Sequence, residues 1–399
     1  MKAPPFSART AWDLTGNPLG EALARARASG RPLVDLTEGN PTRVGLIREE
    51  DARGLVSRLG HPRGIAYAPS AFGHDEARAA VSRYYEERGL AVDPARIALA
   101  ASTSEAYGFL FKLLADRGDE VLIPKPSYPL FSFLADLEDV RLVPYPLVRE
   151  EGFRIDMAAL EAAVSERTRA VMLVHPNNPT GTFVRRDEAA ALEAFAAPRG
   201  IALIVDEVFG DYPRGALPKD RLPSFVGPQE ALTFVLSGLS KVLAQPQLKL
   251  AWIAAMGPAE IVERALARLE VIADTYLSVS TPVQLALPEL LSARGPIQAA
   301  ILTRVGANLA ALDAAIAAAP GCPVRRLPAD GGWYAILDVP RTRDEDAWVS
   351  LLIDEEAVVV HPGYFFDMEH EGSLVVSLLP EPAAFRDGID RLLRRVAEG

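Results

Sequence analysis

The sequence predicts an α/β fold in which helices cover both faces of a mainly parallel sheet, with a second, smaller domain beside it. The middle of the chain alternates short apolar, strand-like runs with stretches of helical spacing. The last third mixes long helical stretches with further short apolar runs. The chain has 399 residues, more than the roughly 100 to 200 residues typical of one domain. We therefore expect two domains.

The N-terminal region is expected to hold a short helix and a strand. Residues 21–29 have helical spacing, and residues 32–36 form an apolar run that predicts a strand. A turn-rich loop, Glu38-Gly-Asn-Pro-Thr42, follows. Helical spacing returns over residues 75–88.

The middle of the chain is expected to form the sheet. Strands are predicted over residues 97–100, 120–123, 141–143, 170–174, 201–205, 233–236 and 251–255. Helices are predicted from residue 105, near residue 133 and from residue 157. This alternation indicates parallel strands joined by helices.

The C-terminal part is expected to be mostly helical. Helices are predicted through residue 269, over 283–291, over 297–318 after a break at Gly295-Pro296, and over 383–396, with strands at 333–337, 357–361 and 374–378. We therefore expect a large domain over about residues 45–290. A smaller domain would combine residues 1–44 with residues 291–399.

Composition limits the classes of function. The net charge is −11 and no basic patch accompanies it, which argues against nucleic acids and anionic membranes as partners. The single cysteine, Cys322, excludes an internal disulfide framework, and the five histidines lack metal-ligand spacing. No apolar signal core and no apolar run of 18 or more residues is found. A cytoplasmic protein that binds a small molecule and no metal is expected.

Three polar residues follow or end three of the predicted strands. Asn178 precedes Asp206 by 28 residues, and Asp206 precedes Lys241 by 35 residues. In an open α/β sheet, ligands bind at the carboxyl ends of the strands. We therefore expect these side chains to meet in one crevice. A lysine amine in such a crevice can hold a carbonyl cofactor covalently.

The segments around these residues resemble the class I aminotransferases. They are His175-Pro-Asn-Asn-Pro-Thr-Gly181, the Asp206-Glu207 pair after a strand, and Ser240-Lys241 with a second base, Lys249, eight residues on. The resemblance extends over nearly the whole chain. It implies the type I fold of pyridoxal phosphate (PLP)-dependent transferases, with a mainly parallel seven-stranded sheet flanked by helices and a smaller α/β domain.

The resemblance also implies roles for five residues around the cofactor ring. Lys241 would form a Schiff base with PLP and later shuttle a proton. Asp206 would keep the ring nitrogen protonated, Asn178 would hydrogen-bond the ring oxygen, and Tyr128 would stack on the ring. Tyr67 would reach the phosphate of a neighbouring subunit. The resemblance therefore implies a homodimer with shared active sites.

A helix N-terminus is the expected phosphate site. Ser102 and Glu105 fit the capping-box pattern before a helical run, and a helix N-terminus is a ready anion site. An ordinary capped helix would show the same pattern. The resemblance assigns the phosphate to Ser102, Thr103, Ser104, Ser240 and Lys249. Lys249 stands where the family usually has arginine, so a point charge replaces a planar bidentate contact.

Two residues depart from the family pattern. Val375 occupies the position of the arginine that usually binds the substrate carboxylate, and valine cannot form that paired contact. Either another base such as Arg43 replaces it, or the substrate presents its carboxylate differently or lacks one. Phe209 stands where many relatives have a tyrosine, which leaves Asn178 as the main partner of the ring oxygen. The pKa of the Schiff base should then be higher.

The substrate side is less defined by the sequence. Gly39, in the loop that lines the family's substrate pocket, and Tyr276 are candidate substrate contacts. Trp333 and Tyr364 are further candidates, although Trp333 fits a core position better.

The predicted function is a PLP-dependent, biosynthetic aminotransferase. It would move an amino group between an amino acid, or a related amine, and a 2-oxo acid. The alternative is a PLP-dependent lyase or decarboxylating enzyme on the same fold. A transcriptional regulator with an aminotransferase-like domain is not favoured, because the first 40 or so residues contain no basic helix-turn-helix.

Overall fold

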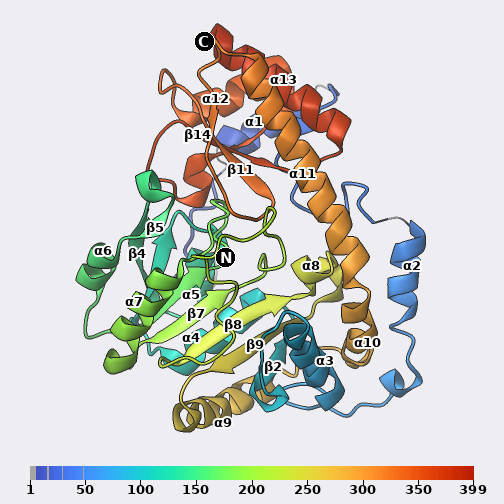
Figure 1. The fold of residues 1–399 in the computed structure, drawn as a ribbon, viewed down its shortest axis with the longest axis vertical. Coiled ribbons are helices and arrows are strands. Elements are labelled where there is room, and N and C mark those ends of the chain that lie inside the picture. Colours follow the sequence, from blue (N-terminus) through green and yellow to red (C-terminus); the bar gives the residue numbers. More distant parts are fainter. Residues whose placement is uncertain (1–5, 16–17, 29, 48) are drawn as a thin grey trace, which may run out of the picture.

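The computed structural model describes residues 6–15, 18–28, 30–47 and 49–399. An eight-stranded sheet lies at its centre, in the order β2-β9-β8-β7-β6-β3-β4-β5 (Figure 1). Its strands are β2 (Ile97–Ala100), β3 (Glu120–Lys125), β4 (Arg141–Val148), β5 (Arg154–Ile155), β6 (Thr168–Val174), β7 (Ala202–Asp206), β8 (Thr233–Gly238) and β9 (Ala251–Met256).

The sheet is mainly parallel, as the sequence predicts. Strands β3, β4, β6, β7 and β8 run parallel, β9 is antiparallel to β2 and β8, and β5 is antiparallel to β4. All seven strands predicted for this sheet are present, and the two-residue β5 adds an eighth. Every residue of β7 is buried, because a parallel strand in the middle of a sheet is covered on both faces.

Two helical layers cover the large sheet. Successive residues of a strand point to opposite faces, so that Leu203 and Val205 of β7 belong to one core, and Ala202 and Ile204 belong to the other. The first core is closed by α3 (Asp75–Glu86), α6 (Met157–Ala163), α7 (Arg186–Ala196) and α10 (Thr281–Ser292), and the second by α4 (Thr103–Leu114), α5 (Leu130–Leu137) and α9 (Ala259–Tyr276).

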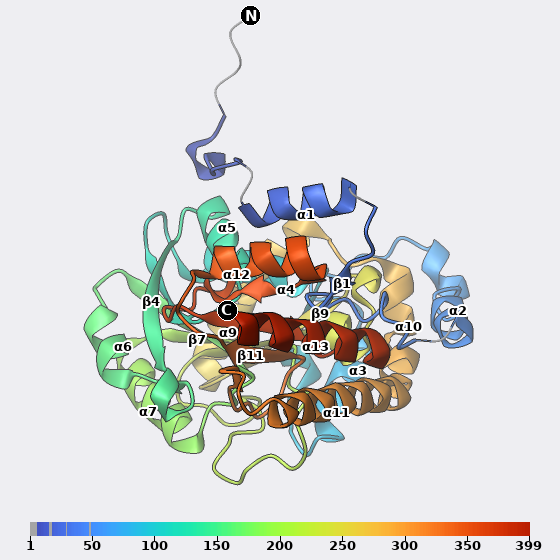
Figure 2. The same ribbon diagram turned by 90° about the horizontal axis from the view of Figure 1, so that it is seen from above.

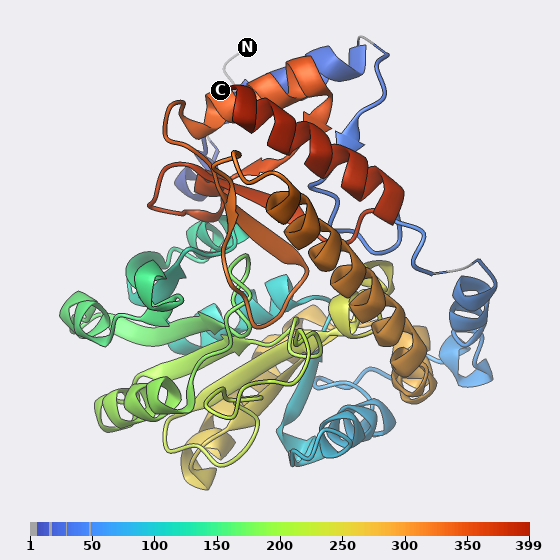
Figure 3. The same ribbon diagram turned by 45° about the horizontal axis from the view of Figure 1, so that its top comes forward.

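A third core combines the two ends of the chain. Leu36 from the N-terminal part packs with Leu312, Val376 and Leu392 from the C-terminal part. Its sheet consists of β10 (Arg325–Arg326), β11 (Tyr334–Asp338), β14 (Ser373–Ser377) and β13 (His361–Pro362), and β1 (Val34–Asp35) pairs in parallel with β12 (Val358–Val359). The helices are α1 (Pro18–Ala28), α11 (Arg294–Ala318), α12 (Glu345–Leu351) and α13 (Pro382–Glu398) (Figures 2 and 3). The domain limits near residues 45 and 290 stay a prediction.

Several elements differ from the sequence prediction. Helix α11 begins at Arg294, so that Gly295 and Pro296 lie in its first turn instead of before it. Proline is tolerated there because the first amides of a helix have no intrahelical partner. The predicted strand 357–361 is divided into β12 and β13. The sequence prediction missed α7, α12 and α2 (Glu49–Ser57); in α7, a run of alanines hides the helical periodicity.

Within the described residues, one helix is long and apolar enough to cross a membrane by length and composition alone. That helix is α11, which packs along α13. Its Ile301, Val305 and Leu312 are buried in the third core, and Arg304 donates hydrogen bonds to the backbone oxygens of Val44 and Leu379. These contacts are typical of a core helix.

Candidate active site

A pocket opens at the carboxyl ends of β6, β7 and β8. Val174, Asp206 and Leu236 lie side by side in the sheet register. Strands β6 and β7 end at this level, and β8 continues two residues further, to Gly238. Asn178 follows four residues after Val174, and Lys241 follows five after Leu236. Asn178, Asp206 and Lys241 all line this pocket. The convergence expected from the strand ends is therefore present.

Lys241 lies on the short helix α8 (Leu239–Val242), directly after β8. Its Nζ is 4.9 Å from the ring centre of Trp333 and 5.3 Å from that of Phe209. Burial lowers the pKa of Lys241 to about 8, and the Asp206 carboxylate opposes that change. The Tyr212 hydroxyl donates a 2.5 Å hydrogen bond to the Lys241 backbone oxygen and fixes the helix that carries the amine.

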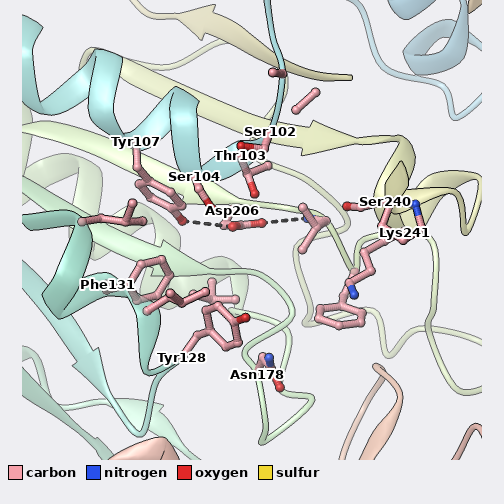
Figure 4. Close-up of a pocket in the computed structure, with 18 of the residues that line it drawn as sticks. Ser102, Thr103, Ser104, Tyr107, Tyr128, Phe131, Asn178, Asp206, Ser240 and Lys241 are labelled. Atoms are coloured by element: carbon pink, nitrogen blue, oxygen red, sulfur yellow. Dashed lines mark hydrogen bonds between the residues drawn. The ribbon is translucent and has the colours of Figure 1, made fainter. Parts of the chain in front are cut away.

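Asp206 is the buried acid of the pocket, with 7% of its surface exposed. One carboxylate oxygen accepts a 3.0 Å hydrogen bond from the Tyr107 hydroxyl, and the other accepts one of 3.0 Å from the Val208 amide (Figure 4). Burial nevertheless raises the pKa of Asp206 to about 6, against the effect of these hydrogen bonds and of Lys241. The carboxylate is short of positive charge. A protonated ring nitrogen would supply it.

The N-terminus of α4 faces the same pocket. Ser102 caps the helix, since its Oγ accepts a 3.1 Å hydrogen bond from the Glu105 amide. The Glu105 carboxylate accepts from the Ala101 amide at 2.7 Å and from the Ser278 hydroxyl at 2.6 Å. The predicted pairing of Ser102 with Glu105 is thus present, although the carboxylate reaches one residue further back than in a standard capping box. The residues of the expected phosphate site that line the pocket are Ser102, Thr103, Ser104, Ser240 and Lys249.

Asn178 and Tyr128 lie on the other side of Asp206 from the Ser102–Ser104 turn (Figure 4). The Asn178 side-chain oxygen is buried and, among the described residues, has no hydrogen-bond partner. Buried polar atoms without a partner are rare in proteins and need an explanation, such as a bound group. The Tyr128 ring packs edge-on against Phe131, 6.0 Å between centres, and 39% of the residue is exposed. Both side chains are placed to contact a ring inside the pocket.

These groups fit PLP as a set. The capped helix and Lys249 offer an anion site, the pKa of the buried Asp206 is raised in the absence of a cation beside it, the Asn178 amide lines the pocket, and Lys241 is a buried amine. No group of three or more potential metal ligands occurs in the part of the chain that the structure describes.

Arg43, Tyr276 and Tyr67 do not line this pocket, and neither do Gly39, Trp333 and Tyr364. The Arg43 side chain is 74% exposed, with its nearest guanidinium nitrogen 3.9 Å from a Glu38 carboxylate oxygen, so water and Glu38 solvate it. The Tyr276 ring packs on Phe109, 5.2 Å between centres, because the end of α9 points it along the surface of α4. The substrate roles expected of Arg43 and Tyr276 stay predictions. Tyr67 is 82% exposed, and its role toward a second subunit stays a prediction.

The remaining substrate candidates are Gly39, Trp333 and Tyr364, and they have different surroundings. A Cβ on Gly39 would lie 2.3 Å from the Tyr334 hydroxyl, so Gly39 lets this pocket-lining tyrosine approach the loop backbone. Trp333 is fully buried, as its core interpretation predicts, and also faces the Lys241 amine. Tyr364 lies outside the pocket lining and donates a 2.6 Å hydrogen bond to Asp346.

The sequence interpretation missed several lining residues. Tyr107 follows Thr103 by four positions on α4 and therefore lies on the same helix face; this spacing could have identified it. Four further lining residues had no local signal, because α5 and β11 reach the pocket only through tertiary packing. They are Leu130, Phe131, Leu134 and Tyr334.

Comparison with known proteins is consistent with this geometry. Residues 31–392 match the family described as aminotransferase class I and II. An alanine aminotransferase of Mycobacterium tuberculosis is 28% identical over 382 residues, which cover 94% of this chain and 88% of the relative. An S-alkyl-thiohydroximate lyase of Arabidopsis thaliana, SUR1, is 31% identical over 267 residues, covering 65% and 57%. The fold of an alanine aminotransferase from Pyrococcus furiosus matches with a TM-score of 0.86 at 21% identity, covering 99% of this chain and 100% of that one.

Proposed function

The chain belongs to the class I and II aminotransferases, and from this premise we propose which residues of its pocket perform the reaction. The protein is a PLP-dependent aminotransferase that moves an amino group between an amino acid, or a related amine, and a 2-oxo acid. The observation that carries the proposed roles is the convergence of Lys241, Asp206 and the capped N-terminus of α4 in one pocket.

Lys241 is the proposed catalytic base and covalent anchor. When bound, PLP supplies an electron sink for the bond changes at the substrate's α-carbon. A pKa of about 8 leaves part of the Lys241 amines unprotonated at neutral pH, so Nζ can attack a carbonyl and can later take up and return a proton. The aromatic rings of Trp333 and Phe209 exclude water from the amine.

The other polar groups orient the cofactor. Asp206 is held in place by Tyr107 and Val208 and would pair with the ring nitrogen. The free amides of α4, with Ser240 and Lys249, bind the phosphate. Asn178 and Tyr128 lie on the other side of Asp206 from the Ser102–Ser104 turn and would contact the cofactor ring.

The active unit is proposed to be a cytoplasmic homodimer serving biosynthesis. Tyr67 is 82% exposed and Ile65 is 95% exposed in the single chain. A second copy would bury this surface and receive Tyr67 at its phosphate site. Sedimentation of the holoenzyme tests the dimer. Mixed dimers of one Lys241→Ala chain and one Tyr67→Phe chain test whether the active sites are shared between chains. If they are, one of the two sites in each mixed dimer contains both native residues.

Transamination is tested by mixing the holoenzyme with an amino acid and following the absorbance of the bound cofactor. We expect conversion of the cofactor without release of ammonia, and its restoration when a 2-oxo acid is added. Release of ammonia and a keto acid from one substrate would contradict the assignment.

A lyase reaction is the second candidate. It is favoured by the similarity to the S-alkyl-thiohydroximate lyase and by Val375 in the place of the carboxylate-binding arginine. A thioether-containing donor that yields a free thiol, detected by a thiol reagent, would support it.

A further inference from the structure

Lys241 lies on α8, a helix of a single turn. Such a turn is weak on its own, because ordering the first turn of a helix costs more free energy than its few hydrogen bonds return. The last backbone oxygens of a helix also lack partners within the helix. Here the Tyr212 hydroxyl donates to the Lys241 oxygen at 2.5 Å. The Gln298 amide donates to the Val242 oxygen at 2.9 Å. Side chains distant in sequence therefore hold the turn that carries the amine.

Gln298 connects this turn to a second anchor. It lies near the start of α11, beside α8 (Figure 1), and its amide nitrogen also donates a 2.9 Å hydrogen bond to the Asp211 carboxylate. Both partners, the Val242 oxygen and the carboxylate, only accept hydrogen bonds. The NH2 group of Gln298 must therefore face them, and each of its two hydrogens has one partner.

Asp211 is itself fixed in place. Only 9% of its side chain is exposed. One carboxylate oxygen accepts a 3.0 Å hydrogen bond from the Tyr84 hydroxyl of α3, and the Arg88 Nε lies 3.6 Å from the other. Arg88 also donates a 2.8 Å hydrogen bond to the Tyr84 hydroxyl. The bridge made by Gln298 is thus attached to a well-packed polar cluster.

The Lys241 amine contacts the third core. Tyr212, which binds the Lys241 backbone oxygen, packs edge-on against Trp333 with 4.9 Å between ring centres. The Lys241 Nζ lies 4.9 Å from the centre of the same indole ring. Tyr212 and Trp333 belong to the third core together with Ile301 of α11. Side chains of this core and of α11 therefore contact both the backbone and the amine of Lys241.

We propose that Gln298 is a positioning residue for the reaction: it fixes the Val242 oxygen relative to Asp211, and thereby the direction in which the Lys241 amine enters the pocket. The inference rests on the proposed function, in which Lys241 captures the cofactor. Gln298 does not line the pocket, so it acts through α8. Because a displacement of about 1 Å at a reacting group can lower a rate by about 100-fold, loss of the bridge should slow the chemistry of Lys241 and leave noncovalent binding intact.

Gln298→Met tests the proposal, because methionine has a similar length and no side-chain N–H to donate. Absorbance after mixing the full-length protein with PLP measures the rate at which Lys241 captures the aldehyde. Calorimetry with 4′-deoxypyridoxine 5′-phosphate, which has no aldehyde, measures binding that does not use the amine. We expect capture to slow by about tenfold or more, and the affinity for the deoxy compound to stay that of the wild type.

Gln229→Met is the matched control. The Gln229 amide also donates to a backbone oxygen, that of Phe225 at 3.0 Å, and Gln229 does not line the pocket. This variant should capture PLP at the wild-type rate. A wild-type capture rate in Gln298→Met would overturn the proposal, and so would equal losses of capture rate and of affinity for the deoxy compound.

A shorter amide keeps the question open to test if Gln298→Met does not fold. Gln298→Asn retains the NH2 group but is one methylene shorter, so it should not reach both acceptors. Its capture of PLP should be slower than in the wild type, and an unchanged rate would overturn the proposal. If the native protein forms no absorbing Schiff base with PLP, the proposed function itself fails, which is a different result.

Discussion

The two sides of the pocket are built from different kinds of side chains and different parts of the chain. The cofactor side takes Asn178, Asp206 and Lys241 from the loops and helix at the ends of three adjacent strands, together with the first turn of α4. The rest of the lining includes neutral side chains from α5 and from β11. The residues proposed to hold the cofactor therefore lie in short motifs along the sequence, whereas the neutral lining residues are assembled by packing.

The two sides also differ in how burial acts on them. On the cofactor side, burial lowers the pKa of Lys241 to about 8 and raises that of Asp206 to about 6, so both groups respond to the charge of a bound partner. Burial also raises the pKa of Tyr128 and Tyr334, and these phenols stay neutral. Substitutions on the cofactor side should therefore have the larger effects.

Lys241→Ala should have the largest effect. Without the amine, the cofactor has no covalent anchor and the reaction loses its proton carrier, so activity should fall by about 10⁴-fold or more. Absorbance of the protein after incubation with PLP shows whether a Schiff base forms. Lys219→Ala, on an exposed loop, is the control and should behave as wild type. An unchanged absorbance in Lys241→Ala would contradict the assignment.

Asp206→Asn should lower kcat without preventing the binding of PLP. The amide keeps the shape but removes the negative charge, so Lys241 should still bind PLP while kcat falls by about 10²-fold. Tyr107→Phe removes one hydrogen bond to Asp206 and keeps the Asp206 charge, so kcat should fall less than in Asp206→Asn. Equal losses in the two variants would show that the Asp206 charge is not what matters.

Capture of PLP by the apoenzyme should depend on pH through Lys241. The amine attacks only when unprotonated, so the rate should rise as pH increases through about 8 and then level off. Asp206→Asn should move the midpoint lower, because the Asp206 carboxylate stabilises the protonated amine. Stopped-flow absorbance from pH 6 to 10, roughly the range over which such an amine titrates, measures the midpoint. A midpoint at the usual lysine value would contradict the effect of burial.

Gly39→Ala should have the smallest effect and act on the substrate side alone. Its Cβ would lie 2.3 Å from the Tyr334 hydroxyl, so Tyr334 must move and KM should rise about tenfold or less, while PLP binding stays unchanged. In the double variant Gly39→Ala/Tyr334→Phe the clashing oxygen is absent. The Gly39→Ala change should therefore raise KM less in the Tyr334→Phe background than in the wild type. Strict additivity of the two changes would show that the contact is not the cause.

The strands and the cofactor side could be predicted from the sequence because their signals are local. Each apolar run that predicts a strand of the large sheet is continuous, and Asp206 and Lys241 follow such runs within a few residues. Asn178, Asp206 and Lys241 then come close together, because β6, β7 and β8 are parallel neighbours and their carboxyl ends lie within two residues of one register level. The same inference applies to other open parallel sheets, in which ligands bind at the carboxyl ends of the strands.

The substrate side could not be predicted, since it depends on how distant elements meet. Arg43 and Gly39 lie four residues apart, yet Gly39 touches Tyr334 while the Arg43 side chain points to water. Tyr276 ends a helix whose last turn lies over Phe109. No spacing in the sequence distinguishes these outcomes, because each one is decided by the direction in which a loop or helix end leaves the core.

The indole of Trp333 gives this enzyme an optical reporter. Its ring centre lies 4.9 Å from the Lys241 Nζ, the atom to which the cofactor would be joined. An excited indole at that range passes its energy to an absorbing neighbour, so its emission should fall as the pocket fills. The chain has four tryptophans, and comparison with Trp333→Phe isolates this one. Cofactor exchange could then be timed by intrinsic fluorescence, without a dye or a coupled assay.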